Sequence, residues 1–169
     1  MRKSTLDPSD RHLLDLVQRD ALRTTDALAD LAGISPSSVQ RRLKRLRDEG
    51  VITAHTAVVD PASVGQAMTF VVGIEIEQKR PDLYANLKRW LADHDAVQQA
   101  YNVTGSSDFI LVVTAATLED YDSLMGRMVA RNPNIRKYVT SVVLQTFKRT
   151  LFTPAGGSGD EDNGCREAS

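Results

Sequence analysis

The stretch Gly33–Gly50 reads GISPSSVQRRLKRLRDEG, and it predicts one capped, strongly basic helix. Ser35 followed by Pro36 is the common pairing of an N-cap residue with a proline in the first helical turn. Gly50 ends the helix, because glycine readily adopts the backbone conformation that follows a last helical turn. Apolar side chains recur within the stretch at helical spacing and predict a buried face made of Val39, Leu43 and Leu46.

This helix also concentrates the positive charge of the chain. Pro36–Arg47 holds five basic side chains and no acidic one, whereas all 169 residues hold 21 Lys and Arg against 22 Asp and Glu. A solvated helical face usually mixes both signs, because opposite charges one turn apart attract each other. A shorter helix that opens at Thr24 and Thr25 and ends at Gly33 completes a helix-turn-helix, whose second helix can lie in the DNA major groove. A solvated, arginine-rich surface helix is the alternative interpretation.

Polar side chains on the other faces of the basic helix suit DNA. Serine hydroxyls and a glutamine amide can hydrogen-bond base edges or phosphates, and arginine and lysine neutralise phosphates or reach guanine. The β-branched run Val51–Val59 predicts a strand-like wing beside the DNA backbone. The predicted DNA-binding residues are Ser35, Ser37, Ser38, Gln40, Arg41, Arg42, Lys44, Arg45 and Arg47 of the helix, and Thr53 and His55 of the wing.

Ahead of these elements, Asp7 followed by Pro8 predicts another capped helix, with Leu13, Leu14, Val17 and further on Leu22 at helical spacing. After the wing, Pro61 and Gly65 bracket a polar stretch that is typical of a linker. We therefore expect a winged helix-turn-helix domain over residues 1–59, a hinge over 60–66, a second domain over 67–152 and a disordered tail over 153–169.

The second domain alternates between strand and helix patterns. The resulting order, β-α-β-β-α-β, predicts an α+β ferredoxin-like fold in which both helices cover one face of the sheet. The opposite face of such a sheet is commonly buried by a second subunit. The predicted elements are strands over Met68–Ile76, Val97–Thr104, Phe109–Ala115 and Val139–Phe147, and helices over Pro81–Asp93 and Leu118–Val129.

Several classes of protein are excluded by composition. The net charge of −1 argues against a uniformly basic coat protein, and no apolar run is long enough to span a membrane. One cysteine, Cys165, allows no internal disulfide, and the three histidines lie far apart, so neither a metal site nor a cofactor is predicted. We expect a cytoplasmic protein that is not an enzyme and has no membrane partner.

An ordered series of motifs resembles the Lrp/AsnC, or feast/famine, family of transcription regulators. The resemblance covers roughly residues 6–149. It is carried by Leu6-Asp7 with Asp10, Leu13-Leu14, Gln18-Arg19-Asp20, Leu28-Ala29, Gly33–Val39, Arg41–Leu46, Glu49–Ile52 and Thr104–Phe109.

The resemblance implies a winged helix-turn-helix joined by a hinge to a ferredoxin-like RAM domain. It further implies homodimers formed by sheet packing, which assemble into higher oligomers such as octamers. The implied partners are double-stranded DNA and a small-molecule effector, such as an amino acid, that binds between dimers and changes assembly or DNA affinity.

The turn Thr104–Asp108 is the predicted effector site. A glycine-containing turn can present backbone N–H groups to a carboxylate, and an aspartate can accept hydrogen bonds from an ammonium group, which together match an amino acid. An ordinary hairpin turn is the alternative, because Gly, Ser and Asp are common turn residues. With the positions that the resemblance adds, the effector residues are Asn102, Val103, Thr104, Gly105, Ser106, Ser107, Asp108, Leu118, Ser141, Val142 and Val143.

Two other functions are possible for a chain of this architecture. Sirohaem decarboxylase subunits are similar in architecture but are enzymes with a degenerate helix-turn-helix, and the intact basic helix argues against that tetrapyrrole chemistry. A stand-alone amino-acid-sensing module would lack the first domain altogether. The sequence therefore favours a DNA-binding regulator.

Overall fold

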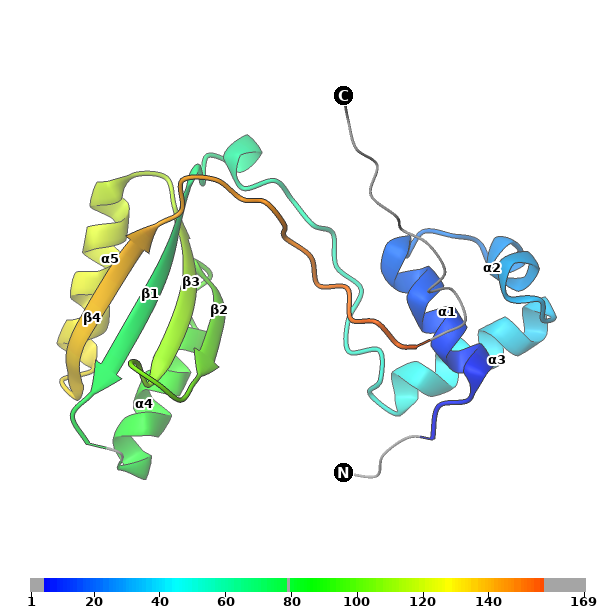
Figure 1. Ribbon diagram of the computed structural model, residues 1–169, viewed down its shortest axis with the longest axis horizontal. Helices are drawn as coiled ribbons and strands as arrows, with labels where there is room; N and C mark the ends of the chain where they lie inside the picture. Colours follow the sequence, from blue (N-terminus) through cyan, green and yellow to red (C-terminus); the bar gives the residue numbers. More distant parts are fainter. Residues whose placement is uncertain (1–4, 79, 157–169) are drawn as a thin grey trace. The chain divides into compact units, whose positions relative to one another are not determined.

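The computed structural model describes residues 5–78 and 80–156 (Figure 1). These residues divide into two compact units. The described part of the first unit comprises 5–57 and 149–156, and the described part of the second comprises 58–148 without residue 79. Each unit has its own hydrophobic core.

The first unit contains three helices, α1 (Pro8–Arg19), α2 (Thr25–Ala32) and α3 (Pro36–Asp48), and each begins at a polar N-cap. The caps are Asp7, Thr24 and Ser35, whose side chains accept a backbone N–H of the first turn. Gly33 ends α2 with φ of 64°, a left-handed conformation that favours glycine. The capped helix starts predicted from the sequence are confirmed.

The core of the first unit packs α1, α2 and α3 against one another. Its buried apolar side chains are Leu13, Leu14, Leu28, Ala29, Val39, Leu43 and Leu46. The prediction that Leu22 extends the apolar face of the first helix is wrong, because α1 ends at Arg19 and the Leu22 side chain is 93% exposed.

The second unit is built on a four-stranded sheet of order β2-β3-β1-β4, in which every neighbouring pair is antiparallel. Its strands are β1 (Met68–Ile76), β2 (Val97–Asn102), β3 (Phe109–Ala115) and β4 (Ile135–Val142). A short 3-10 helix, η1 (Ala62–Val64), precedes β1. The predicted ferredoxin-like order is confirmed.

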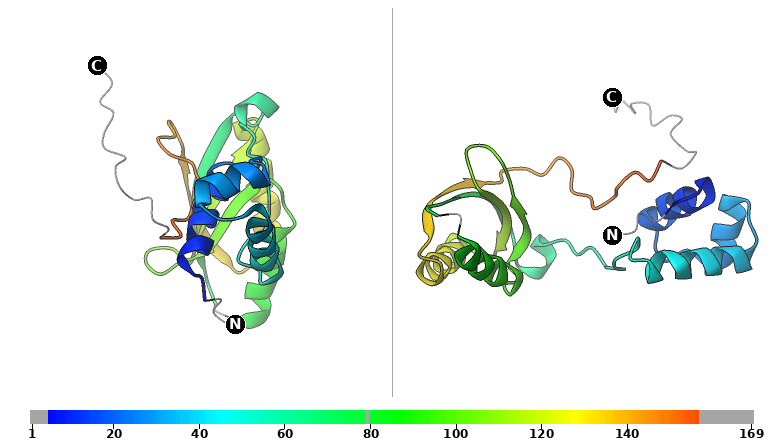
Figure 2. Two further views of the ribbon diagram at one scale, coloured as in Figure 1. Left: turned by 90° about the vertical axis from the view of Figure 1, so that its right-hand side faces the viewer. Right: turned by 90° about the horizontal axis from the view of Figure 1, so that it is seen from below.

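Helices α4 (Pro81–Ala92) and α5 (Leu118–Arg131) lie on the same face of this sheet (Figure 2). Strand residues alternate between faces, so Phe70, Val72 and Ile74 of β1 point toward the helices and are fully buried. On α5, Tyr121 stacks on Phe70 with 3.9 Å between ring centroids. Neither α4 nor α5 lies on the opposite face of the sheet (Figure 2).

Strand β4 differs from its predicted position over Val139–Phe147. It runs from Ile135 to Val142, because pairing with β1 ends where Phe70 faces Val142. One further backbone bond joins the Val143 N–H to the Thr69 carbonyl. Beyond that point, Leu144 and Phe147 are 96% and 91% exposed, so the prediction that the last strand continues to Phe147 is wrong.

The end of the described chain also departs from the predicted domain limits. The segment Arg149–Gly156 belongs to the first unit, rather than to the second domain and a disordered tail. Backbone groups of Thr153 and Ala155 hydrogen-bond side chains of α1, which gives this segment a defined place. Residues 157–169 of the predicted tail lie outside the described residues.

Candidate nucleic-acid interface and effector loop

Helix α3 presents one continuous polar stripe to solvent. Its members recur at intervals of three and four residues, so they lie on one side of the helix, opposite Val39, Leu43 and Leu46. We call this stripe the outward face of α3, and its exposed residues are Ser37, Gln40, Arg41, Lys44 and Arg47.

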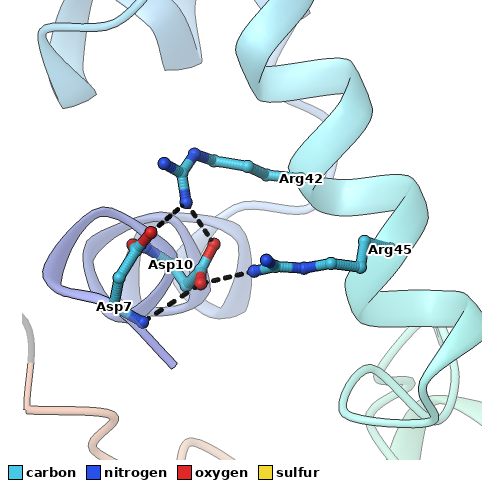
Figure 3. Close-up of polar contacts among 4 residues, drawn as sticks. All are labelled: Asp7, Asp10, Arg42 and Arg45. Carbon is cyan, nitrogen blue, oxygen red and sulfur yellow. Dashed lines mark hydrogen bonds and ion pairs between the residues drawn. The ribbon is translucent and has the colours of Figure 1, made fainter. Parts of the chain in front are cut away.

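Two cations of α3 do not belong to the outward face. Arg42 and Arg45 lie on the flank of α3 and reach the start of α1, where they meet two carboxylates (Figure 3). Arg42 donates to Asp7 at 2.5 Å and to Asp10 at 2.7 Å, and Arg45 donates to Asp10 at 2.5 Å. The Arg42 side chain is only 22% exposed as a result.

Asp10 is the centre of this cluster, because its side chain is fully buried. It also accepts the backbone N–H of Asp7 at 3.1 Å, while Asp7 accepts the backbone N–H of Asp10 at 2.8 Å, so a capping box starts α1. A buried carboxylate is tolerated only when it is paired and hydrogen-bonded, as Asp10 is here. The cluster therefore fixes the position of α3 relative to α1.

The two carboxylates have shifted pKa values. The hydrogen bond from Arg42 is the main reason that the pKa of Asp7 lies below its ordinary value. Burial acts to raise the pKa of Asp10, but the hydrogen bonds from Arg42, the Asp7 backbone and Arg45 together hold it below the ordinary value. The same contacts raise the pKa of Arg42, chiefly through Asp7.

The serines at the start of α3 are joined by their hydroxyls. Ser35 accepts the backbone N–H of Ser38 at 3.3 Å, and its oxygen lies 2.9 Å from the Ser38 hydroxyl and 3.2 Å from the Ser37 hydroxyl. Ser35 thus acts as the helix cap, while Ser37 is exposed beside the first backbone N–H groups of α3. Such a helix start attracts anions.

The predicted wing strand is wrong for this chain. Residues 51–59 form no strand, and the backbone N–H groups of Val51 and Ile52 both bond the Leu46 carbonyl at the end of α3. Thr53 and His55 are exposed beyond this turn, and Arg47 Nε donates to His55 Nε2 at 3.3 Å. β-branched residues alone do not make a strand, because a strand needs a hydrogen-bonded neighbour.

In the second unit, the turn Thr104–Asp108 connects β2 to β3. Gly105 has φ of 129°, a conformation that side chains disfavour. Ser107 approaches β1 so closely that its hydroxyl oxygen lies 2.6 Å from where a Cβ on Gly73 would be. Gly73 therefore leaves the space that the Ser107 side chain occupies, a contact that the sequence analysis did not predict, although a glycine inside a strand is a known signal of close approach.

Asp108 anchors this turn to β1. Its backbone N–H bonds the Ile74 carbonyl at 2.8 Å, and its carboxylate accepts the Ile76 N–H at 3.0 Å. The Asp108 carbonyl in turn accepts the Val103 N–H and the Asn102 side-chain amide. Asp108 therefore has a structural role in addition to the predicted one of receiving an ammonium group.

The predicted effector residues form two groups within one chain. Asn102, Val103 and Thr104–Asp108 lie at the end of the sheet where β3 begins, whereas Leu118, Ser141, Val142 and Val143 lie at the end where β3 stops. The seven residues of β3 separate these ends by about 20 Å. Two shallow hollows of about 300 and 370 Å³ lie along α5, and neither includes a predicted effector residue.

Other kinds of site receive no support from the part of the chain that the structure describes. It contains no group of three or more His, Cys, Asp or Glu side chains arranged to hold a metal ion. Nor does any of its helices have the length and apolar character needed to cross a membrane.

Comparison with known proteins extends over both units. Residues 6–53 match the family described as winged helix-turn-helix DNA-binding, and residues 69–151 match the Lrp/AsnC ligand binding domain. An uncharacterized HTH-type transcriptional regulator of Sinorhizobium fredii is 40% identical over 149 residues, which cover 88% of each chain.

Solved structures agree with these matches. An AsnC family transcriptional regulator from Agrobacterium tumefaciens is 26% identical with a TM-score of 0.83, over 88% of this chain and 97% of that one. A feast or famine regulatory protein from M. tuberculosis, complexed with L-methionine, is 28% identical with a TM-score of 0.78, over 88% of this chain and 99% of that one.

Proposed function

The chain belongs to the Lrp/AsnC family of DNA-binding transcriptional regulators, and from this premise we propose that the outward face of α3 reads DNA and that a small molecule controls the binding. The relatives that it matches are named transcriptional regulators, so the chain is a regulator rather than a tetrapyrrole enzyme.

The main support for DNA binding by the outward face is that the cations of α3 fall into two groups. Arg42 and Arg45 are held by Asp7 and Asp10, whereas the cations of the outward face point to solvent. Arg41, Lys44 and Arg47 are therefore available to neutralise phosphates, and Ser37 and Gln40 lie near the helix start, where base edges are usually read. Arg42 and Arg45 act as positioning residues that set the angle of α3.

The residues around α3 have supporting roles in this proposal. The hydroxyls of Ser37 and Ser38 and the backbone N–H groups of the first turn would receive a phosphate at the helix start, while Ser35 holds the cap. Thr53 and His55 would contact the sugar-phosphate backbone beside α3. Because Arg47 touches His55, both residues would follow the same strand of DNA.

The face of the sheet away from α4 and α5 supports a homodimer. Strand alternation and register put on it the side chains of Val71, Tyr101, Ile110, Val112 and Val139. Val71, Tyr101 and Val139 are 36%, 53% and 52% exposed, which is a large apolar area for a lone subunit to leave in water. A second copy packed against this face would bury it, and pairs of dimers would give larger assemblies such as octamers.

An effector site shared between copies follows from the separation of the predicted residues. The turn Thr104–Asp108 of one copy would supply backbone N–H groups for a carboxylate, and the opposite sheet end of another copy would supply Leu118, Ser141, Val142 and Val143. An amino acid is the proposed class of effector, since the M. tuberculosis relative is complexed with L-methionine. Binding at such a shared site would change assembly, and through assembly DNA affinity.

DNA binding by the outward face is tested on operators selected from a random DNA library with the full chain. In Arg41→Ala/Lys44→Ala we expect Kd to rise at least tenfold at a fixed salt concentration, because two phosphate contacts are lost. The matched control is Lys88→Ala/Arg89→Ala, which removes two exposed cations of α4 and should leave Kd within about twofold. Equal loss in both variants would refute the assignment to α3.

The effector is tested by thermal shift of the full chain against L-methionine and the other amino acids. A bound ligand at a hundredfold excess over Kd adds about 2.7 kcal/mol of stability, a shift that is easily measured. The shift should disappear in Gly105→Val, because the turn needs the backbone conformation of glycine. A shift that survives in Gly105→Val would move the effector site away from this turn.

A further inference from the structure

A surface on α1 binds a segment from the far end of the chain. Arg11, Asp15 and Gln18 are spaced four and three residues apart, so they lie on one side of α1, and Arg19 lies beside them. All four side chains contact the segment Phe152–Ala155, which is more than 130 residues away in sequence.

The hydrogen bonds follow the pattern of a strand partner. The Gln18 side chain donates to the Thr153 carbonyl at 2.9 Å and accepts the Thr153 N–H at 2.8 Å. Two residues further on, the Ala155 N–H donates to Asp15 at 2.9 Å, and the Ala155 carbonyl accepts from Arg11 at 2.7 Å. Side chains of one helix thus satisfy the backbone donor and acceptor of alternate residues, as a neighbouring β-strand would.

The sequence of the segment suits this contact. Pro154 stands at the position between the two bonded residues, where no backbone N–H is needed and where its fixed φ keeps the chain extended. Ala155 is small and packs against the hydrophobic core of the first unit. The Arg19 guanidinium lies 4.7 Å above the centre of the Phe152 ring, a cation–π contact at the start of the segment.

We propose that this face of α1 is a docking surface for the chain's own segment Phe152–Ala155, which makes that segment a fourth structural element of the DNA-binding domain. The chain then connects its two domains twice, once after Ala57 and once before Arg149. The second connection continues directly from β4. It leads to α1, the helix whose Asp7 and Asp10 also hold α3. Docking of this segment completes the first domain and needs neither DNA nor an effector.

Residue-level hydrogen exchange on the full chain tests the docking. The amides of Thr153 and Ala155 should exchange at least tenfold more slowly than in an unstructured peptide. Asp15→Ala should restore fast exchange chiefly at Ala155, and Gln18→Ala chiefly at Thr153. The matched control is Asp30→Ala, which removes an exposed carboxylate of α2 and should change neither amide.

The outcomes separate docking from general loss of structure. Fast exchange at both amides in the unmodified chain would overturn the proposal, as would equal effects of Asp15→Ala and Asp30→Ala. Replacing Phe152 by the photo-reactive analogue p-benzoylphenylalanine identifies the chain that is contacted. A cross-link to α1 at the mass of a single chain is expected, whereas a covalent dimer would overturn docking within one chain. Neither measurement uses DNA, so failure here leaves the proposed function standing.

Discussion

Two groups of cations lie on the same helix, α3, and are close neighbours in the sequence, yet their environments differ. Arg42 and Arg45 turn toward α1 and meet Asp7 and Asp10, while the cations of the outward face meet solvent. The acids that capture Arg42 lie 35 and 32 residues earlier in the chain. A basic helix is therefore not a binding surface on all sides, because some of its cations bind carboxylates of the same domain and hold the helix in place.

Asp10→Ala should have the largest effect on the stability of the first domain. Removing the buried carboxylate leaves two guanidinium groups without their common acceptor, so we expect the first domain to lose about 3–5 kcal/mol of unfolding free energy. Urea denaturation followed by far-UV circular dichroism measures the loss. Trp90 packs against the core of the second domain, so its fluorescence reports that domain separately and should be unchanged.

The control for Asp10→Ala is Asp30→Ala, an exposed carboxylate of α2 whose loss should change stability by no more than about 0.5 kcal/mol. Similar curves for the two variants would mean that the cluster at the start of α1 does not hold α3.

The neighbours Arg42 and Arg41 should respond in opposite ways to replacement by alanine. Arg42→Ala should lower the unfolding free energy by about 1.5–3 kcal/mol, because hydrogen bonds between charged groups are lost. Arg41→Ala should leave stability unchanged within about 0.5 kcal/mol and weaken DNA binding instead. Denaturation curves and DNA titrations on both single variants measure the two effects. Loss of stability in Arg41→Ala, rather than in Arg42→Ala, would contradict the assigned roles.

The same cluster predicts an acid-sensitive first domain. The folded pKa of Asp7 and Asp10 lies below the ordinary value of 3.8, so the folded state binds fewer protons than the unfolded state near that pH. The stabilisation is complete above about pH 5 and is lost as pH falls through 3.8 toward the lower folded pKa. Denaturation at a series of pH values should show this loss in the unmodified chain and a weaker one in Asp10→Asn. Parallel pH profiles would contradict it.

The smallest expected effect concerns Asp48 at the end of α3. It pairs with Lys44 at 2.8 Å, but the side chains are 76% and 62% exposed, so the pair contributes less than about 1 kcal/mol. Asp48→Ala should therefore leave stability nearly unchanged and tighten DNA binding slightly, because it removes a negative charge that pairs with Lys44 of the outward face. Weaker binding in Asp48→Ala would show that Lys44 needs this carboxylate for its position.

The sequence predicts those parts of the fold that depend on local chemistry. Asp7, Thr24 and Ser35 cap helices where they were expected, because a side-chain oxygen followed by helix formers acts within one turn. Strands β1 and β3 have the predicted bounds, Met68–Ile76 and Phe109–Ala115. The helix caps need no information from elsewhere in the chain.

Features that depend on a distant partner were not predictable in the same way. The β-branched residues 51–59 find no neighbouring strand, and β4 ends where β1 stops pairing with it. The roles of Arg42 and Asp108 depend on Asp10 and on the Ile76 N–H, each more than thirty residues away. The binding of Phe152–Ala155 to α1 carried no local pattern at all.

The salt dependence of DNA binding shows whether the outward face of α3 binds DNA, since it measures how many phosphates that face neutralises. A plot of the logarithm of the observed association constant, Kobs, against the logarithm of the salt concentration has a negative slope. We predict that Arg41→Gln/Lys44→Gln/Arg47→Gln makes this slope less negative by about three units than in the unmodified chain. Unfolding free energy should stay within about 1 kcal/mol in the same variant. An unchanged slope in a folded variant would contradict the account.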